Sequence, residues 1–116
     1  MEIDARVKAV IRMMEQSLAG DISLRTLAKN VNLSPPRLRQ LFKKDTGVSP
    51  IQYVRRLRAR KAAYLLQTSF LSIKEVAFQS GSGDVSHFVR DFKKHYGLTP
   101  SEFRVRAERH VEPSMR

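Results

Sequence analysis

The sequence predicts an all-α fold of seven helices, and three observations support this prediction. Apolar residues recur every three or four positions along most of the chain, as they do on one face of a helix. No segment alternates polar and apolar residues with the period of two that indicates a half-buried strand. Capping residues and glycines recur at the boundaries between the periodic segments. A chain of 116 residues with these features is one small domain or two joined lobes.

The chain contains an internal repeat. Residues 42–50 read Phe-Lys-Lys-Asp-Thr-Gly-Val-Ser-Pro, and residues 92–100 read Phe-Lys-Lys-His-Tyr-Gly-Leu-Thr-Pro. Upstream, residues 23–28 resemble residues 72–77 at an offset of 49 rather than 50, so the second copy has one extra residue. A repeat of this period usually means that one supersecondary unit is used twice. Two copies suit a protein that contacts its partner in two places.

Residues 4–18, 24–30 and 35–46 are predicted to form the first three helices. Ser23 caps the second helix, and Ser34 caps the third, which has a proline at its first position where a missing N–H costs nothing. Glycines follow the first and third helices and end them. The residues expected to face the core are Val7, Val10, Ile11, Met14, Leu18, Leu24, Leu27, Ala28, Leu38, Leu41 and Phe42.

The predicted fourth helix, residues 50–67, is the longest. Five of the seven residues 55–61 are cationic, and this run has two interpretations: the solvated face of the helix, or arginines that bridge the two lobes. The apolar side expected for this helix consists of Ile51, Val54, Leu57, Ala62, Leu65 and Leu66.

Three shorter helices are predicted in the second copy of the repeat, at residues 73–80, 85–96 and 100–108. Capping boxes of the Ser/Thr-x-x-Glu type open the first and the last of them. Asp84 caps the middle helix, which Gly97 ends. This middle helix is expected to bury Phe88, Phe92 and Tyr96.

The composition favours a polyanionic partner. There are 22 Lys and Arg against 11 Asp and Glu, which gives a net charge of +11. Such a balance suits nucleic acid or an anionic surface. The chain has no cysteine, so disulfides and thiolate metal sites are excluded, and no apolar stretch approaches the length of a membrane span. The first residues do not resemble a signal peptide, so a cytoplasmic, nucleoid-associated location is expected.

A short helix, a tight turn and a second helix form the helix-turn-helix pattern, which residues 24–42 and 73–92 each supply. The second helix of such a motif enters the major groove. Arg reads guanine and Gln reads adenine there, and valines can meet thymine methyl groups. Burial of the predicted apolar stripes leaves an exposed set on each second helix: Pro36, Arg37, Arg39, Gln40 and Lys43, and Val85, Ser86, Val89, Arg90 and Lys93.

The chain resembles the DNA-binding domain of the AraC/XylS family of bacterial transcription regulators from about residue 7 to residue 106. The resemblance is closest in the second copy, where the pattern Ile-x-x-Val-Ala-x-x-x-Gly over residues 73–81 precedes Asp-x-Ser-x-Phe-x-Arg-x-Phe-Lys-Lys over residues 84–94. Gly-x-Thr-Pro-x-x-Phe-Arg then follows at residues 97–104. The resemblance implies two helix-turn-helix subdomains, joined by a linker helix, that read successive major grooves of a promoter.

The resemblance also implies the residues and partners of binding. Base contacts fall on Pro36, Arg37, Arg39, Gln40, Val85, Ser86, His87, Val89 and Arg90. Apart from the resemblance, phosphate contacts are expected at Ser34, Lys43, Lys44, Lys93 and Lys94, and the alternative for the four lysines is that they are solvated charges. The partners implied are double-stranded promoter DNA, RNA polymerase and, in a longer parent chain, an N-terminal effector or dimerisation domain. Activator function is expected, and neither a cofactor nor a membrane is implied.

The predicted domain organisation follows from the two motifs. Residues 4–49 form the first helix-turn-helix subdomain, residues 50–67 the linker helix and residues 68–108 the second subdomain, and residues 109–116 form a frayed tail. The linker helix would span about 26 Å at 1.5 Å per residue, which suits two reading helices in grooves about 34 Å apart.

One residue departs from the family pattern. The family has a large aromatic residue directly after the glycine of the second turn, where this chain has Ser82. The corresponding residue of the first copy is Leu33, which indicates a core position. We therefore expect weaker packing in the second subdomain.

Other functions fit the sequence less well. Arg39 and Arg90 could be ordinary solvated charges, and charge alone could make the chain a non-specific nucleic-acid or anionic-surface binder. The three histidines have neither cysteine partners nor the spacing of a metal site, so no metal is expected. No catalytic triad or phosphate-binding loop is present, so we expect no enzyme activity.

Overall fold

The computed structural model describes residues 2–20 and 22–109, apart from the side chain of Arg109. The helices are α1 (Ala5–Gln16), α2 (Leu24–Asn30), α3 (Pro35–Thr46), α4 (Pro50–Thr68), α5 (Ile73–Gln79), α6 (Val85–Tyr96) and α7 (Pro100–Arg109). Among the described residues there are seven helices and no strand, which confirms the predicted all-α fold.

The chain divides into two compact units, and the boundary falls inside α4, between Leu57 and Arg58. Each half of α4 therefore belongs to a different core. The predicted tail, residues 109–116, lies outside the described residues except for the backbone of Arg109, which is the last residue of α7.

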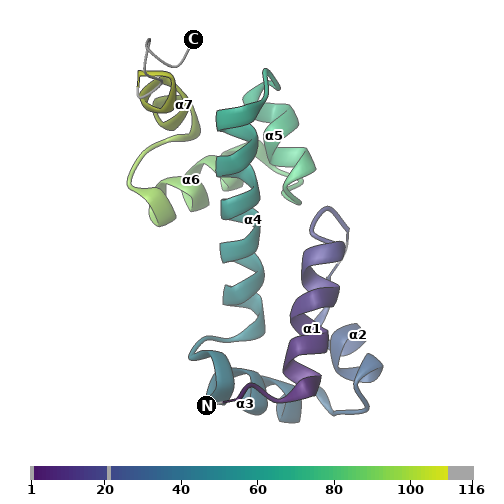
Figure 1. Cartoon of the computed structure of the whole chain (residues 1–116). Coiled ribbons are helices and arrows are strands. Elements are labelled where there is room, and N and C mark those ends of the chain that lie inside the picture. Colours follow the sequence, from purple (N-terminus) through teal and green to yellow (C-terminus); the bar gives the residue numbers. More distant parts are fainter. Residues whose placement is uncertain (1, 21, 110–116) are drawn as a thin grey trace. The chain divides into compact units, whose positions relative to one another are not determined.

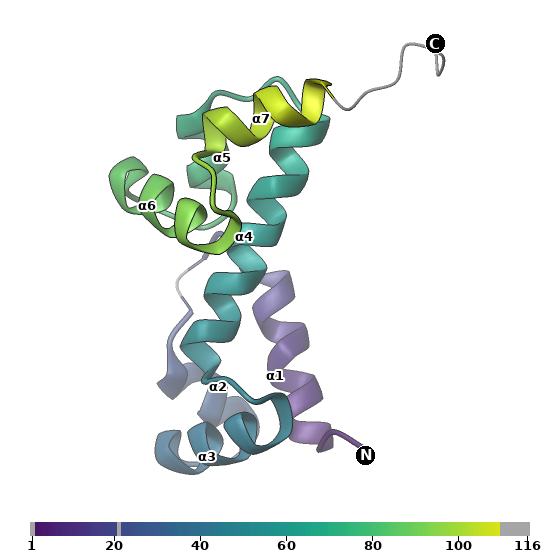
Figure 2. The same cartoon turned by 90° about the vertical axis from the view of Figure 1, so that its left-hand side faces the viewer.

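The first unit contains α1, α2 and α3, which pack against one another, and the first half of α4 (Figures 1 and 2). Phe42 of α3 is fully buried, and its ring meets Tyr53 of α4 edge-on at a centroid distance of 5.3 Å. Asp4, Ser23 and Ser34 cap the three helices through their side-chain oxygens; the caps at Ser23 and Ser34 were predicted, and the cap at Asp4 was not. The buried core consists of Val7, Val10, Met14, Leu18, Leu27, Ala28, Leu38, Phe42, Val54 and Leu57.

The second unit contains the second half of α4 with α5, α6 and α7 (Figures 1 and 2). Its centre is an aromatic cluster in which Phe92 lies 4.7 Å from Tyr96 and 5.3 Å from Phe103, measured between ring centroids. These distances lie in the range that aromatic pairs prefer. The buried core consists of Ala62, Ala63, Leu66, Val76, Ala77, Phe88 and Phe92.

The turn between the two helices of each motif has the same hydrogen bond in both units. The Leu33 N–H donates to the Ala28 carbonyl at 2.9 Å, and the Ser82 N–H donates to the Ala77 carbonyl at 2.8 Å. Leu33 and Ser82 are therefore structurally equivalent, and the extra residue of the second copy lies after Ser82, at Gly83.

Six residues predicted to be buried are exposed or only partly buried. Ile51 is 57% exposed because Pro50 takes the buried place at the start of α4 and the next residue turns about 100° away from it. Tyr96 is 38% exposed because it closes the edge of the aromatic cluster at the last turn of α6. The other four are half-buried: Ile11, Leu24 and Leu41 pack against the first core, and Leu65 packs against the second.

Candidate nucleic-acid interface

Helix α3 exposes the residues that the sequence assigns to base reading in the first unit. Ser34 caps the helix by accepting a hydrogen bond from the Arg37 N–H at 3.2 Å. The inner face of the helix packs against the first core through Leu38 and Phe42. Gly47 ends the helix in the left-handed conformation, at a φ of 84°, which a residue with a side chain rarely adopts. The residues left exposed on α3 are Pro36, Arg37, Arg39, Gln40, Lys43 and Lys44.

The cations of α3 are available to an external anion. Among the described residues, none of Arg37, Arg39, Lys43 and Lys44 forms an ion pair with a carboxylate. The carboxylate of α3 itself, Asp45, is half-buried and accepts a hydrogen bond from the backbone N–H of Asp4 at 2.9 Å. This face of α3 therefore carries uncompensated positive charge.

Helix α6 has the same construction in the second unit. Asp84 caps it by accepting a hydrogen bond from the His87 N–H at 3.2 Å. Its inner face packs against the second core through Phe88 and Phe92. Gly97 ends the helix at a φ of 76°. The exposed residues of α6 that the sequence assigns to DNA contacts are Val85, Ser86, His87, Arg90, Lys93 and Lys94.

Val89 is the exception in this set. Its side chain is half-buried and packs against the second core, so the prediction that it faces outward is wrong in part. Val89 follows the buried Phe88 directly, and such a neighbour lies about 100° round the helix, at the flank of the outer face.

Hydrogen bonds at the helix starts hold several carboxylates in their charged form. The backbone N–H of His87 lowers the pKa of Asp84, and the charges of His87 and Arg90 add to this effect. The backbone N–H of Thr99 lowers the pKa of Glu102, to which the charge of Lys93 also contributes. Asp84 therefore stays negative beside the proposed base-reading residues of α6, and this reduces the positive charge of that face.

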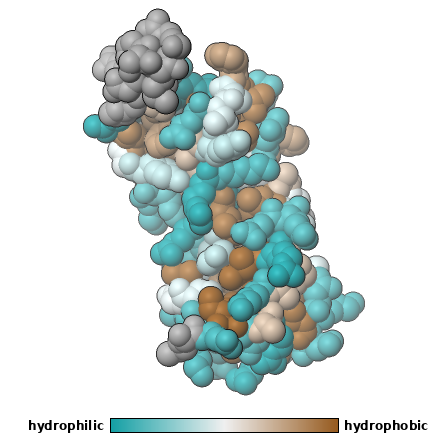
Figure 3. Space-filling model, in the orientation of Figure 1, coloured by the Kyte–Doolittle hydropathy of each residue, from teal (hydrophilic) through white to brown (hydrophobic). Residues whose placement is uncertain are grey.

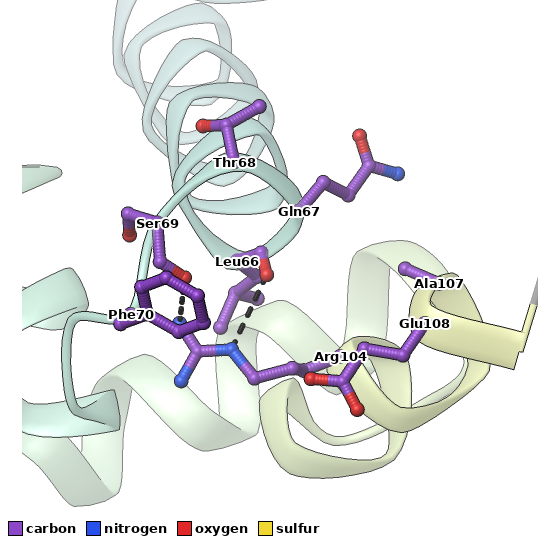
Figure 4. A pocket seen from close by; sticks show the side chains of 8 residues that line it. All are labelled: Leu66, Gln67, Thr68, Ser69, Phe70, Arg104, Ala107 and Glu108. Atoms are coloured by element: carbon purple, nitrogen blue, oxygen red, sulfur yellow. Dashed lines mark hydrogen bonds between the residues drawn. The ribbon is translucent and has the colours of Figure 1, made fainter. Parts of the chain in front are cut away.

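Two long-range interactions are absent from the sequence-based prediction. The first is the hydrogen bond between Asp45 and Asp4. In the second, the Arg104 guanidinium of α7 donates from Nε to the Leu66 carbonyl at 3.2 Å and from a terminal nitrogen to the Ser69 carbonyl at 3.4 Å (Figure 4). Arg104 thus satisfies carbonyls at the end of α4, which a helix leaves unpaired. Arg104 belongs to the family pattern, but a residue pattern does not show a partner that lies 38 positions away.

The hollows on the second unit include one of about 470 Å³, lined by Leu98, Ser101, Glu102, Val105 and Arg106, and two others. One, of about 670 Å³, is lined by Arg104 and the end of α4 together with the fully exposed Phe70, and none of the predicted DNA-contacting residues lines it (Figure 4). The other, of about 370 Å³, lies between α5 and the start of α6, and Ser82 and Val85 are among its lining residues. Ser82 is half-buried there, and its hydroxyl donates to the Asp84 carbonyl at 3.1 Å.

The described part of the chain provides no other obvious chemistry. Within residues 2–20 and 22–109, no group of three or more His, Cys, Asp or Glu side chains could hold a metal ion. None of the described helices is long and apolar enough to cross a membrane. Hydrophilic residues predominate on the face shown in Figure 3, with hydrophobic residues in smaller patches between them.

Comparison with known proteins gives consistent results. Residues 27–106 match a family model described as a helix-turn-helix domain. The chain is 34% identical, over 101 residues, to the HTH-type transcriptional activator RhaS of Enterobacter sp. (strain 638); the match covers 87% of this chain and 36% of RhaS. The chain thus spans about a third of the length of this curated relative.

Solved structures show the same fold. A transcriptional regulator from Chromobacterium violaceum, described as containing an AraC-type DNA-binding domain, is 27% identical with a TM-score of 0.85, and the match covers 91% of this chain and 95% of that one. The DNA-binding domain of the global transcriptional factor AdpA, solved in complex with a target DNA, is 25% identical with a TM-score of 0.83. The match covers 88% of this chain and 92% of the AdpA domain.

Proposed function

Since the chain belongs to the AraC-type family of helix-turn-helix domains, we propose that it binds double-stranded promoter DNA sequence-specifically. The observation that carries this proposal is the duplicated motif, in which α3 and α6 each present an exposed polar and cationic face on an apolar anchor. A helix of this kind fits the major groove, and two of them suit a site with two half-sites.

The residues of the two helices divide into two roles. Base edges of the first half-site are contacted by Pro36, Arg37, Arg39 and Gln40. Base edges of the second half-site are contacted by Val85, Ser86, His87, Val89 and Arg90. Phosphate contacts from Ser34, Lys43, Lys44, Lys93 and Lys94 position the protein without reading sequence. For Val89, which packs partly against the core, the proposed contact is limited to the exposed edge of its side chain.

The wider role of the protein is transcription activation. RhaS carries the word activator in its name, and recruitment of RNA polymerase to a promoter is the output that we propose for this chain. The remaining two thirds of RhaS have no counterpart in this chain, which leaves room in a longer parent protein for an effector or dimerisation domain. We propose a cytoplasmic, nucleoid-associated location and no enzymatic activity.

Selection of bound fragments from genomic DNA, followed by footprinting, tests the proposal. We expect a discrete protected site with two conserved half-sites whose centres lie about 10–10.5 base pairs apart. A purely electrostatic binder would protect all sequences equally and would lose affinity with salt at the same rate on every probe. Uniform protection would therefore favour non-specific binding over the proposed function.

A further inference from the structure

The internal repeat allows α3 and α6 to be compared position by position. Both helices have 12 residues, begin directly after a capping residue and end at a glycine with positive φ. Each residue of α3 therefore corresponds to the residue 50 positions later in α6. The inner anchors agree, because the buried Phe42 corresponds to the buried Phe92. Differences on the outer faces thus compare equivalent positions.

The outer face of α3 is the more cationic of the two. Arg37 corresponds to His87 and Arg39 to Val89, whereas Gln40 corresponds to Arg90, so α6 has one guanidinium group where α3 has two. Residues 34–46 contain four Lys and Arg side chains and one carboxylate. The equivalent residues 84–96 contain three Lys and Arg side chains and two carboxylates.

The carboxylates increase this difference. Asp45 of α3 is half-buried and hydrogen-bonded to the backbone N–H of Asp4 at 2.9 Å, so it is partly withdrawn from solvent. Asp84 and Asp91 of α6 are both exposed. A DNA phosphate approaching α6 therefore meets both fewer cations and more exposed anions than one approaching α3.

The start of α6 adjoins an exposed aromatic side chain of α5, which the start of α3 lacks. Val85 is the first residue of α6 and is 38% exposed. It borders the hollow of about 370 Å³, to which Phe78 of α5, itself 74% exposed, also contributes. The residues equivalent to Val85 and Phe78 in the first unit are Pro35 and the cation Lys29. The N-terminal residues of a recognition helix are the ones that contact base edges.

We propose that the two helices hold DNA by different chemistry. Helix α3 brings most of the cationic charge to the DNA, from Arg37 and Arg39 at base edges as well as from its lysines at phosphates, and hence supplies most of the salt dependence of binding. Helix α6 contributes less charge and recognises its half-site partly through contact of Val85 with thymine methyl groups. This inference rests on the proposed function. Its physical basis is that each cation placed against the DNA, at a phosphate or at a base edge, displaces condensed counterions, whereas apolar contact between Val85 and a methyl group displaces none.

Exchange of equivalent residues between the two helices tests the electrostatic part. We expect the double variant R37H/R39V to reduce the steepness of the fall of log K with log salt by about two. H87R should increase that steepness by about one. Each variant carries a residue that the other helix already has at that position, and thermal unfolding checks that each is folded. An unchanged slope in R37H/R39V would show that these arginines are solvated; an unchanged slope in H87R would show that the two helices dock differently. Either result overturns the proposal.

Replacement of thymine by uracil in the DNA tests the apolar part, because uracil lacks only the methyl group. In the second half-site, we expect one such replacement at the contacted base to weaken wild-type binding about fourfold. The same replacement should leave binding by V85A unchanged, and uracil throughout the first half-site should have little effect on either protein. Equal losses in wild type and V85A, or no loss in either, would overturn the assignment to Val85.

These experiments separate the inference from the proposed function. A wild-type footprint without a discrete site would remove the proposed function itself. A discrete site combined with unchanged salt slopes and no uracil effect would retain the proposed function and remove only the difference in chemistry between α3 and α6.

Discussion

A leucine at position 82 should stabilise the second unit. Leu33, the equivalent residue of the first unit, is half-buried against its core, and full burial of a leucine side chain contributes about 1.5–3 kcal/mol. Half-burial of a leucine in the hollow beside Ser82 should therefore add about 1 kcal/mol. The change removes the hydrogen bond from the Ser82 hydroxyl to the Asp84 carbonyl, a loss of about 0.5 kcal/mol. The net gain in unfolding free energy is about 0.5 kcal/mol or slightly more.

Native-state hydrogen exchange measures this effect in the unit concerned. The amides of α5 and α6 should exchange about two- to threefold more slowly in Ser82→Leu than in wild type, in proportion to the gain in free energy. In wild type these amides should exchange faster than those of α2 and α3, because the first unit retains Leu33. Leu33→Ser is the matched control, and it should lower the protection of α2 and α3. Faster exchange of α5 and α6 in Ser82→Leu would show that the hollow cannot accept the side chain and would refute the reasoning.

Four further substitutions have defined outcomes. Lys43→Ala and Lys93→Ala should each weaken binding to all sequences about equally and lower the salt slope by about one, measured by salt titration on several probes. Arg104→Ala should lower the unfolding free energy of the second unit by about 1–2 kcal/mol in a denaturant titration, because two carbonyls at the end of α4 lose their charged donor. Asp84→Asn should keep a capping oxygen but remove its charge. Because the folded-state pKa of Asp84 is lowered, the stability difference between Asp84→Asn and wild type should be present above about pH 4 and disappear as the pH falls through that pKa.

The helices could be predicted from the sequence because the signals that start and end them are local. At the start of α5, the Ser72 N–H donates to the Glu75 carboxylate at 2.9 Å, and the Ser72 hydroxyl accepts from the Glu75 N–H, within four consecutive residues. The glycines with positive φ that end α3 and α6 are equally local. An equivalent hydrogen-bonded pair between Ser49 and Gln52 at the start of α4 was not predicted, although its residues also lie within four positions.

Features that depend on distant parts of the chain could not be predicted. The bond between Asp45 and Asp4 joins residues 41 positions apart, and the bond from Arg104 to Leu66 joins residues 38 positions apart. No spacing rule relates such pairs. The exposure of Ile51 was also missed, because the burial of Pro50 against the first core turns the next residue of α4 away from it.

Most of the candidate site could be placed from helical periodicity alone. Once Phe42 and Phe92 are assigned to the core, the exposed residues of α3 and α6 follow from 3.6 residues per turn. Val89 could not be placed in this way, because it lies at the flank of α6, where the packing of neighbouring side chains decides whether a valine is covered. Which of the exposed residues contact bases remains a prediction.

The central claim is that α3 and α6 read two separate half-sites. Its most direct test compares Arg39→Ala with Arg90→Ala on a library of all single-base changes in the bound site. Arg39 belongs to α3 and Arg90 to α6, and both side chains are exposed. We expect each substitution to weaken binding by about 1–3 kcal/mol and to relax base preference in one half-site only, with the two affected half-sites about one helical turn apart. If both substitutions relax preference at the same base pairs, the two helices do not read separate half-sites and the account of this protein is wrong.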